Sequence, residues 1–85
     1  MIGMIVPLDG SWKLEAASVI YTGRGSTVFT ISPEAYDEIE GRTPRPGDVI
    51  KTLVCSNYGK YTRGRISRVW TCKCGCVRLE VFGVK

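Results

Sequence analysis

No histidine occurs among the 85 residues of the chain. Imidazole is the side chain that most often transfers protons near neutral pH. Its absence excludes histidine-based acid–base catalysis, Ser–His and Cys–His nucleophile pairs, and every zinc site that needs an imidazole ligand. The remaining carboxylates and thiols form no set of acid, base and nucleophile. We therefore expect a protein that is not an enzyme.

The sequence also lacks a long hydrophobic run. Its first eight residues are apolar, but they carry no basic leader, and Pro7 and Asp9 interrupt the segment. A signal peptide or a membrane span is therefore not expected. Hydrophobic residues make up 44% of the chain and charged residues 24%, close to the globular average. We expect one small domain that is soluble, cytoplasmic and not bound to a membrane.

The net charge of +4 is unevenly distributed along the chain. Residues 1–41 carry two basic and six acidic side chains, a net of −4, whereas residues 42–85 carry ten basic and two acidic side chains, a net of +8. A half this basic favours an anionic partner, either nucleic acid or an acidic protein surface. The alternative is a dipolar protein whose two halves face each other or pack head to tail in an oligomer.

Short segments rich in β-branched and aromatic residues indicate a mainly β fold. We expect strands at residues 2–6, 49–54, 64–72 and 77–84, and a hairpin of residues 16–22 and 27–31 around the glycine-rich loop 23–26. Ser32 and Pro33 are typical of a helix start, so one short helix should run from Pro33 to about Glu40 and stop at Gly41. Pro46 and Gly47 suit the centre of a type II turn.

The last two strands can be placed in register by the turn between them. Lys73, Cys74 and Gly75 predict a three-residue loop with Gly75 in the left-handed conformation. The pairs that follow from this loop are Cys72 with Cys76, Thr71 with Val77, Trp70 with Arg78, Val69 with Leu79, Arg68 with Glu80, Ser67 with Val81 and Ile66 with Phe82. Trp70 then lies between Arg68 and Arg78, an arrangement suited to base stacking and phosphate contact. The alternative is a core tryptophan that the N-terminal strand covers.

A family resemblance covers about a third of the chain. Gly47-Asp48-Val49-Ile50, then Gly59-Lys60, then Gly64-Arg65-Ile66-Ser67-Arg68-Val69 resembles the KOW element of SH3-like barrels, which occurs in ribosomal large-subunit proteins and in elongation factors of the NusG kind. The three-residue step from Ile66 to Val69 also implies a β-bulge. The resemblance implies a small SH3-like barrel with an N-terminal hairpin and one short helix. The chain departs from the family pattern in its longer loop and in its cysteine-rich hairpin tip.

We therefore expect a small, basic, non-enzymatic module that binds RNA or DNA through its C-terminal half. Tyrosines and tryptophan would offer stacking faces, and lysine and arginine would neutralise phosphates. The expected contact residues are Tyr58, Lys60, Tyr61, Arg63, Arg65, Arg68, Trp70 and Arg78. The alternative is a protein-binding accessory subunit, such as a viral inhibitor or a virion structural protein, that uses the same patch on an acidic protein surface.

Cys72, Cys74 and Cys76 alternate around the hairpin tip, and their thiolates could converge on a metal ion. Structural zinc normally takes four ligands, and the fourth thiol, Cys55, should lie far from the tip along a meander of strands. Zinc, a Cys72–Cys76 disulfide and free thiols remain open from the sequence, and no other cofactor is expected.

Overall fold

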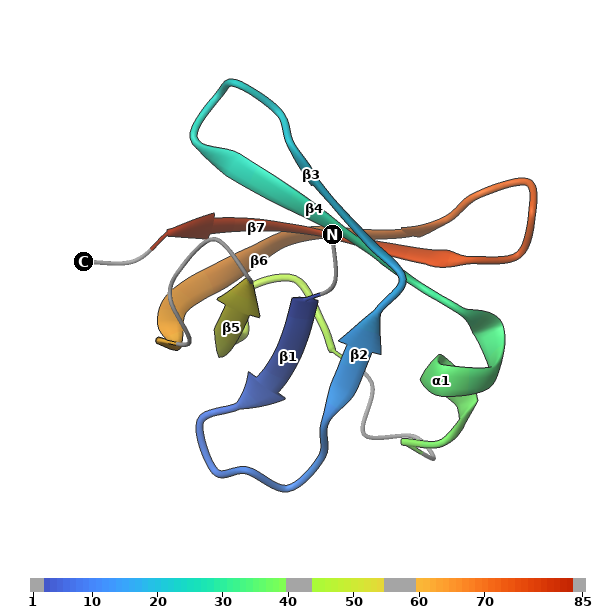
Figure 1. The fold of residues 1–85 in the computed structure, drawn as a ribbon, viewed down its shortest axis with the longest axis horizontal. Coiled ribbons are helices and arrows are strands. Elements are labelled where there is room, and N and C mark those ends of the chain that lie inside the picture. Colours follow the sequence, from blue (N-terminus) through green and yellow to red (C-terminus); the bar gives the residue numbers. More distant parts are fainter. Residues whose placement is uncertain (1–2, 40–43, 55–59, 84–85) are drawn as a thin grey trace.

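A computed structural model describes residues 3–39, 44–54 and 60–83 and shows a mainly β fold (Figure 1). The strands are β1 (Gly3–Pro7), β2 (Leu14–Ala16), β3 (Ser18–Tyr21), β4 (Ser26–Ile31), β5 (Val49–Val54), β6 (Thr62–Thr71) and β7 (Val77–Gly83), and the helix is α1 (Pro33–Asp37). The expected β-rich class with one short helix is confirmed.

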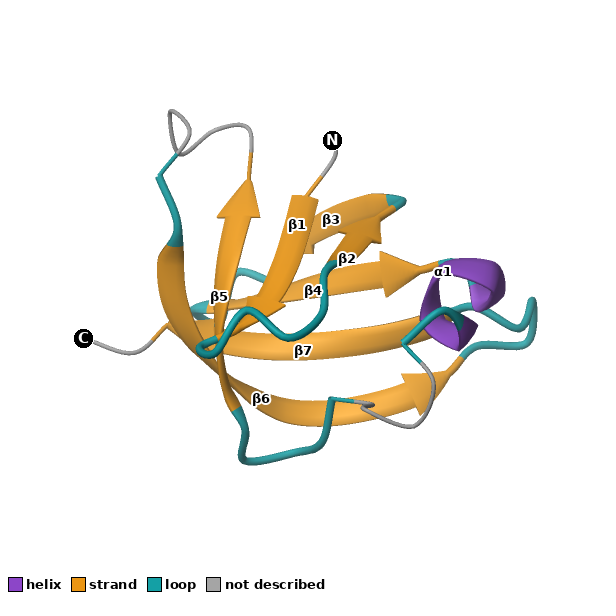
Figure 2. Ribbon diagram, turned by 90° about the horizontal axis from the view of Figure 1, so that it is seen from below, coloured by secondary structure: helices purple, strands orange, loops and turns teal. Residues whose placement is uncertain are grey.

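All strands belong to one antiparallel sheet with the order β2-β1-β5-β6-β7-β4-β3. The two strands at its ends, β2 and β3, follow each other in the chain with only Ala17 between them. The sheet therefore curls until its ends meet, and the Ala17 N–H donates to the Thr30 carbonyl of β4 at 2.7 Å. Figures 1 and 2 show β1, β2 and β5 facing β4 and β7 across this curved sheet.

Alternate residues of the strands point into the enclosed space and form the hydrophobic core. Ile5, Phe29, Ile50, Ile66 and Leu79 are almost completely buried there. They come from five different strands, so both the acidic and the basic parts of the chain build one core. Trp12, Ala35, Tyr36 and Val69 pack against it from its rim.

The residue that begins α1 behaves as the sequence predicts. Ser32 is the N-cap, its Oγ accepts a hydrogen bond from the Ala35 N–H at 3.2 Å, and Pro33 stands in the first turn. The helix is shorter than predicted: it ends at Asp37, with Glu38 as its C-cap. Ile39 follows the helix and is buried in the core. The predicted stop at Gly41 lies outside the described residues.

The predicted N-terminal hairpin is present, but its first strand differs from the prediction. The segment expected as one strand from Ala16 is divided at Ala17, so that β2 pairs with β1 and β3 pairs with β4. The alternation of exposed and buried residues changes at this point, which a pattern of residue types alone does not show. The turn at Pro46 and Gly47 is confirmed: Gly47 has φ 95°, and the Asp48 N–H donates to the Arg45 carbonyl at 3.1 Å.

The β6–β7 hairpin has the predicted turn and, near its tip, the predicted register. Gly75 has φ 92°, and the pairs from Thr71 with Val77 back to Arg68 with Glu80 are confirmed. The expected pairs of Ser67 with Val81 and of Ile66 with Phe82 are wrong. A bulge at Ser67 places Ile66 opposite Val81 and Arg65 opposite Phe82. The predicted bulge and the predicted uninterrupted ladder exclude each other, because an extra residue on one strand shifts every pair beyond it by one position.

Candidate functional site

The outer surface of β6 carries a row of arginines. Gly64 and Ile66 are buried, so Arg63 and Arg65 point outward, and Arg68 joins them after the bulge. All three arginines are exposed, and Arg65 Nη1 donates to the Gly47 carbonyl at 3.1 Å. On the neighbouring strand β5, Lys51 stands opposite Arg63. We call Arg63, Arg65 and Arg68 the arginine row.

A hollow of about 280 Å³ lies beside the row, where β3, β4, β6 and β7 come together. We call it the tryptophan hollow; its lining is Ile20, Thr22, Arg24, Val28, Arg68, Trp70, Arg78 and Glu80. The register explains this grouping, because Val28 stands opposite both Ile20 on β3 and Glu80 on β7. Three cations and one carboxylate line the hollow, so its formal charge is positive.

Trp70 is half-buried on the outer surface and lies outside the hydrophobic core of the described residues. The guanidinium carbon of Arg68 is 4.4 Å from the centroid of the Trp70 ring, a cation–π contact. Arg78 stands opposite Trp70 in the β6–β7 ladder. The tryptophan therefore lies between two arginines, as the sequence predicts, and it is not a core residue.

Two polar atoms next to this tryptophan lack a hydrogen-bond partner among the described residues. They are Arg78 Nε and Thr30 Oγ1, both buried, and the two residues stand opposite each other on β7 and β4. A buried N–H without an acceptor costs free energy, about 1–3 kcal/mol for a typical group. Both atoms are closed off from solvent, so a ligand could reach them only if neighbouring side chains moved.

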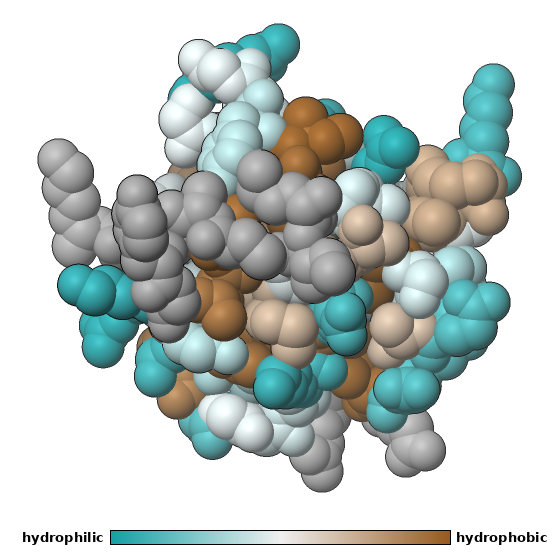
Figure 3. Space-filling model, in the orientation of Figure 1, coloured by the Kyte–Doolittle hydropathy of each residue, from teal (hydrophilic) through white to brown (hydrophobic). Residues whose placement is uncertain are grey.

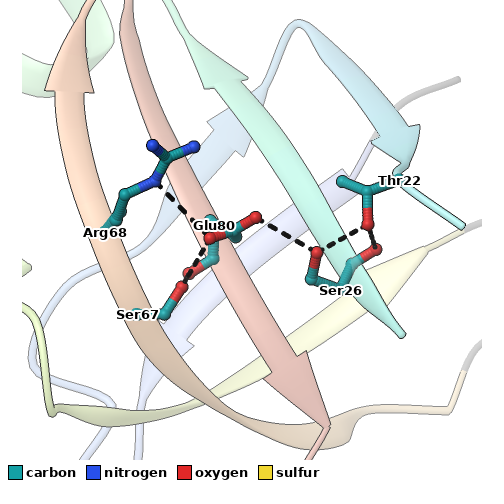
Figure 4. Close-up of polar contacts among 5 residues, drawn as sticks. All are labelled: Thr22, Ser26, Ser67, Arg68 and Glu80. Atoms are coloured by element: carbon teal, nitrogen blue, oxygen red, sulfur yellow. Dashed lines mark hydrogen bonds and ion pairs between the residues drawn. The ribbon is translucent and has the colours of Figure 1, made fainter. Parts of the chain in front are cut away.

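The carboxylate of the hollow is already engaged (Figure 4). Glu80 accepts hydrogen bonds from Ser67 Oγ at 2.8 Å and from Ser26 Oγ at 3.2 Å, and Arg68 Nε lies 3.5 Å from its Oε1. The hydrogen bond from Ser67 contributes most to holding the pKa of the Glu80 carboxyl below its usual value, and Ser26 and Arg68 act in the same direction against partial burial. Glu80 thus links β4, β6 and β7 as an anion.

Apolar side chains also reach this surface. Ile20 is 50% exposed on β3, and Phe82 is 38% exposed on β7 opposite Arg65. Figure 3, in the orientation of Figure 1, shows hydrophobic residues, in brown, between hydrophilic ones, in teal, on one face of the molecule. Two large apolar side chains therefore lie close to arginines: Phe82 opposite Arg65, and Ile20 in the lining that also holds Arg68.

The structure brings most of the predicted contact residues to one strand and its neighbour. Arg63, Arg65, Arg68 and Trp70 lie on β6 and Arg78 lies on β7, while Lys60 and Tyr61 are exposed just before β6 begins. Tyr58 lies outside the described residues.

Sequence reasoning missed Ile20, Thr22, Arg24 and Val28, which form the far wall of the hollow. Ile20 and Val28 stand next to the buried Val19 and Phe29, which marks them as outward, but the pairing of β4 with β7 that brings them here leaves no local signal.

The three cysteines of the hairpin tip converge. One donor atom from each of Cys72, Cys74 and Cys76 lies within 4.8 Å of the other two, close enough together to hold a metal ion. Cys72 and Cys74 are joined as a disulfide, and Cys76 is free. The expected alternative of a Cys72–Cys76 disulfide is therefore wrong for this state, although the backbones of these residues do pair, with the Cys72 N–H donating to the Cys76 carbonyl at 2.9 Å. Cys55 lies outside the described residues.

Comparison of the chain with protein-family models, with curated proteins and with solved structures finds no match. None of the helical segments described is long and apolar enough to cross a membrane. The function of the site therefore has to be argued from its geometry.

Proposed function

We propose that the protein is a non-enzymatic module that binds single-stranded nucleic acid on the arginine row and the tryptophan hollow. The observation that carries this proposal is the position of Trp70 between Arg68 and Arg78, at the end of a line of exposed arginines on one strand. Proteins that bind single strands combine cations along the backbone path with aromatic rings on which bases stack. The resemblance of residues 47–69 to the KOW element supports the same function.

Spacing and charge both suit a flexible polyanion. Successive outward residues of a strand are about 6.6 Å apart, so Arg63 and Arg65 can contact neighbouring phosphates of one strand. Arginine can form two parallel hydrogen bonds with the oxygens of one phosphate, which makes it a more specific phosphate ligand than lysine. Glu80 is the one carboxylate in the lining of the hollow, and its oxygens already accept hydrogen bonds from two serines. Its negative charge is offset by Arg68, whose Nε lies 3.5 Å from the carboxylate.

Stacking requires that the ring of Trp70 become available. Arg68 now occupies one face of the ring, and its side chain is 66% exposed, so it can move without breaking the core. A base could replace the guanidinium on the ring, while the guanidinium turns to a phosphate. Arg78 Nε and Thr30 Oγ1 would gain a partner if an oxygen of the ligand reached them.

The experiment is a titration of fluorescently labelled single-stranded RNA, single-stranded DNA and duplex DNA with the protein at 50 mM and 200 mM salt. We expect single strands to bind, more weakly at the higher salt, and Trp70→Ala to bind less tightly. A lack of binding to every oligonucleotide at 50 mM salt would contradict the proposal.

The second candidate is a protein-binding subunit that grips an acidic protein surface. The exposed side chains of Ile20 and Phe82 favour it, because apolar anchors beside arginines are typical of protein interfaces. The titration with oligonucleotides separates the two candidates, because a protein-binding subunit should bind none of the oligonucleotides tightly. Replacement of Ile20 by Ser should weaken a protein complex much more than a complex with a short oligonucleotide.

We also propose that a zinc ion would have a structural role at the cysteine tip. The support is the convergence of three sulfur donors on a tip whose strands carry Trp70 and Arg78. A metal ion there would hold the two strands together at their ends. Native mass spectrometry of reduced protein with added zinc tests this role, and a protein that takes up no zinc would contradict it.

A further inference from the structure

We infer that the reduced hairpin tip binds one thiophilic d10 ion, zinc(II) or copper(I), through Cys72, Cys74 and Cys76 alone, and that the Cys72–Cys74 disulfide is the state in which this site is closed to metal. The inference rests on the proposed metal role of the tip and extends it in two respects. The site is complete without Cys55, and its occupancy depends on the oxidation state of the tip.

The geometry of the tip requires little change to receive an ion. Ligands at about 2.3 Å from one metal are about 3.8 to 4.0 Å from each other in tetrahedral or trigonal coordination. The three donor atoms lie within 4.8 Å of one another, and after reduction the sulfurs of Cys72 and Cys74 have to separate from bonding distance by about 1.5–2 Å. Rotations about χ1 of both cysteines can share this separation.

The backbone of the tip holds the cysteines in this arrangement. Cys72 and Cys76 face each other at the end of the ladder, and the Gly75 N–H donates to the Cys72 carbonyl at 3.0 Å. Gly75 has φ 92°, which turns the chain back so that Cys74 stands at the apex. A Cβ on Gly75 would lie 3.6 Å from Pro33 Cγ, so the tip is supported by the start of α1. Figure 2 shows α1 and the β6–β7 tip at the same end of the molecule.

The donor set selects the ion. Within the described ranges, Cys72, Cys74 and Cys76 form the one group of three or more side chains that could hold a metal ion. All of its donor atoms are sulfur. Soft thiolate donors select zinc(II), copper(I) and iron–sulfur clusters over calcium and magnesium. Cys74 is exposed and the other two cysteines are half-buried, so ions and small reductants can both reach the site.

The disulfide and the metal compete for the same sulfur atoms. In the oxidised state the Cys72–Cys74 bond leaves Cys76 as the one thiol of the hairpin tip, and one thiolate does not make a site. A dithiol reductant reverses this state: its two thiols become a disulfide, and two electrons and two protons pass to Cys72 and Cys74 as their S–S bond breaks. Metal binding then forms three metal–sulfur bonds, and the three thiols release three protons to solvent.

The experiment compares the full chain in two states, reduced by a dithiol under anaerobic conditions and oxidised. Each is titrated with zinc(II) and with copper(I), and native mass spectrometry counts the ions. We expect one ion per chain in the reduced protein and at least 100-fold weaker binding in the oxidised protein. The competition between the two ions identifies the preferred metal. Equal metal binding in both states would overturn the inference.

Two variants separate this inference from the broader metal role. Cys55→Ser should bind metal as the wild type does, whereas Cys76→Ser should lose the ion although its Cys72–Cys74 pair is intact. Loss of metal in Cys55→Ser, or one ion shared by two chains, would overturn the three-thiolate site and leave the metal role standing. No metal in the reduced wild type would overturn both. Comparison of the two wild-type states needs no substitution, so a variant that fails to fold does not affect the test.

Discussion

The salt dependence of nucleic-acid binding gives a quantitative test of the arginine row. Arg63, Arg65, Arg68 and Arg78 supply four positive charges, and Glu80 offsets one of them, so about three phosphates should be neutralised. For single strands, the logarithm of the association constant falls with the logarithm of the salt concentration with a slope of about −0.7 per phosphate. The expected slope is therefore about −2, which corresponds to an affinity about 20-fold lower at 200 mM than at 50 mM salt.

Substitutions separate the contribution of charge, which sets the slope, from the contribution of stacking, which sets the affinity at a given salt concentration. The double variant Arg63→Gln, Arg65→Gln should reduce the slope to about −0.7, and the affinity should then fall only about threefold over the same salt range. Trp70→Ala should leave the slope unchanged but lower the affinity at every salt concentration about 5- to 150-fold, because stacking contributes about 1–3 kcal/mol per base. The assay is fluorescence anisotropy of a labelled oligonucleotide at four or more salt concentrations.

Two controls protect this interpretation. Lys13→Gln removes an exposed cation between β1 and β2, which lies on neither β6 nor β7, and should not change the slope. Arg65→Lys keeps the charge but disturbs the hydrogen bond to Gly47, so it should retain the wild-type slope. A slope near zero for the wild type, or an equal loss of slope in Lys13→Gln and Arg65→Gln, would refute the reasoning.

Three further predictions concern stability. Leu79→Ala removes a side chain that is 0% exposed and should lower the free energy of unfolding by about 2–5 kcal/mol, measured by urea denaturation, whereas a change below 1 kcal/mol would contradict the described core. Glu80 has a lowered pKa in the folded state, so its stabilising effect is present above the ordinary carboxyl pKa and is lost as the pH falls through the lowered value. Glu80→Gln should flatten the pH dependence of thermal stability in that acidic range, and an unchanged profile would argue against the bonds from Ser67 and Ser26. Gly47→Ala should destabilise the protein by about 1 kcal/mol or more, because Gly47 has φ 95°, and an unaffected melting temperature would contradict the type II turn.

Features that depend on adjacent residues could be predicted from the sequence. The N-cap at Ser32, the turn at Gly47 and the hairpin turn at Gly75 each follow from the conformational preference of one or two residues. The register near the β6–β7 tip followed from the turn, and so did the place of Trp70 between two arginines. Each of these interactions lies within one turn or one hairpin, so the local order of residues determines them.

Features that depend on residues far apart in the chain could not be predicted from the sequence. Ser26 donates to Glu80, which is 54 positions away, and no residue type at either position indicates that β4 pairs with β7. The far wall of the tryptophan hollow was missed for this reason. The disulfide between Cys72 and Cys74 was also missed, because the spacing of three cysteines allows several pairings and does not distinguish among them.

The bulge at Ser67 has a consequence for which changes β6 can accept. From Arg63 to Ile66, odd-numbered residues face the solvent and even-numbered ones the core; after the bulge, Arg68 and Trp70 face the solvent and Val69 the core. The single extra residue thus reverses the parity of the strand. Ile66 stands opposite Val81 and Arg68 opposite Glu80, so a deletion of Ser67 would leave these pairs and both faces in place, whereas a straight strand that kept Ser67 would turn Arg68 and Trp70 inward and Val69 outward. The outward position of Trp70 therefore depends on the bulge that accommodates the extra residue, and not on the number of residues in the strand.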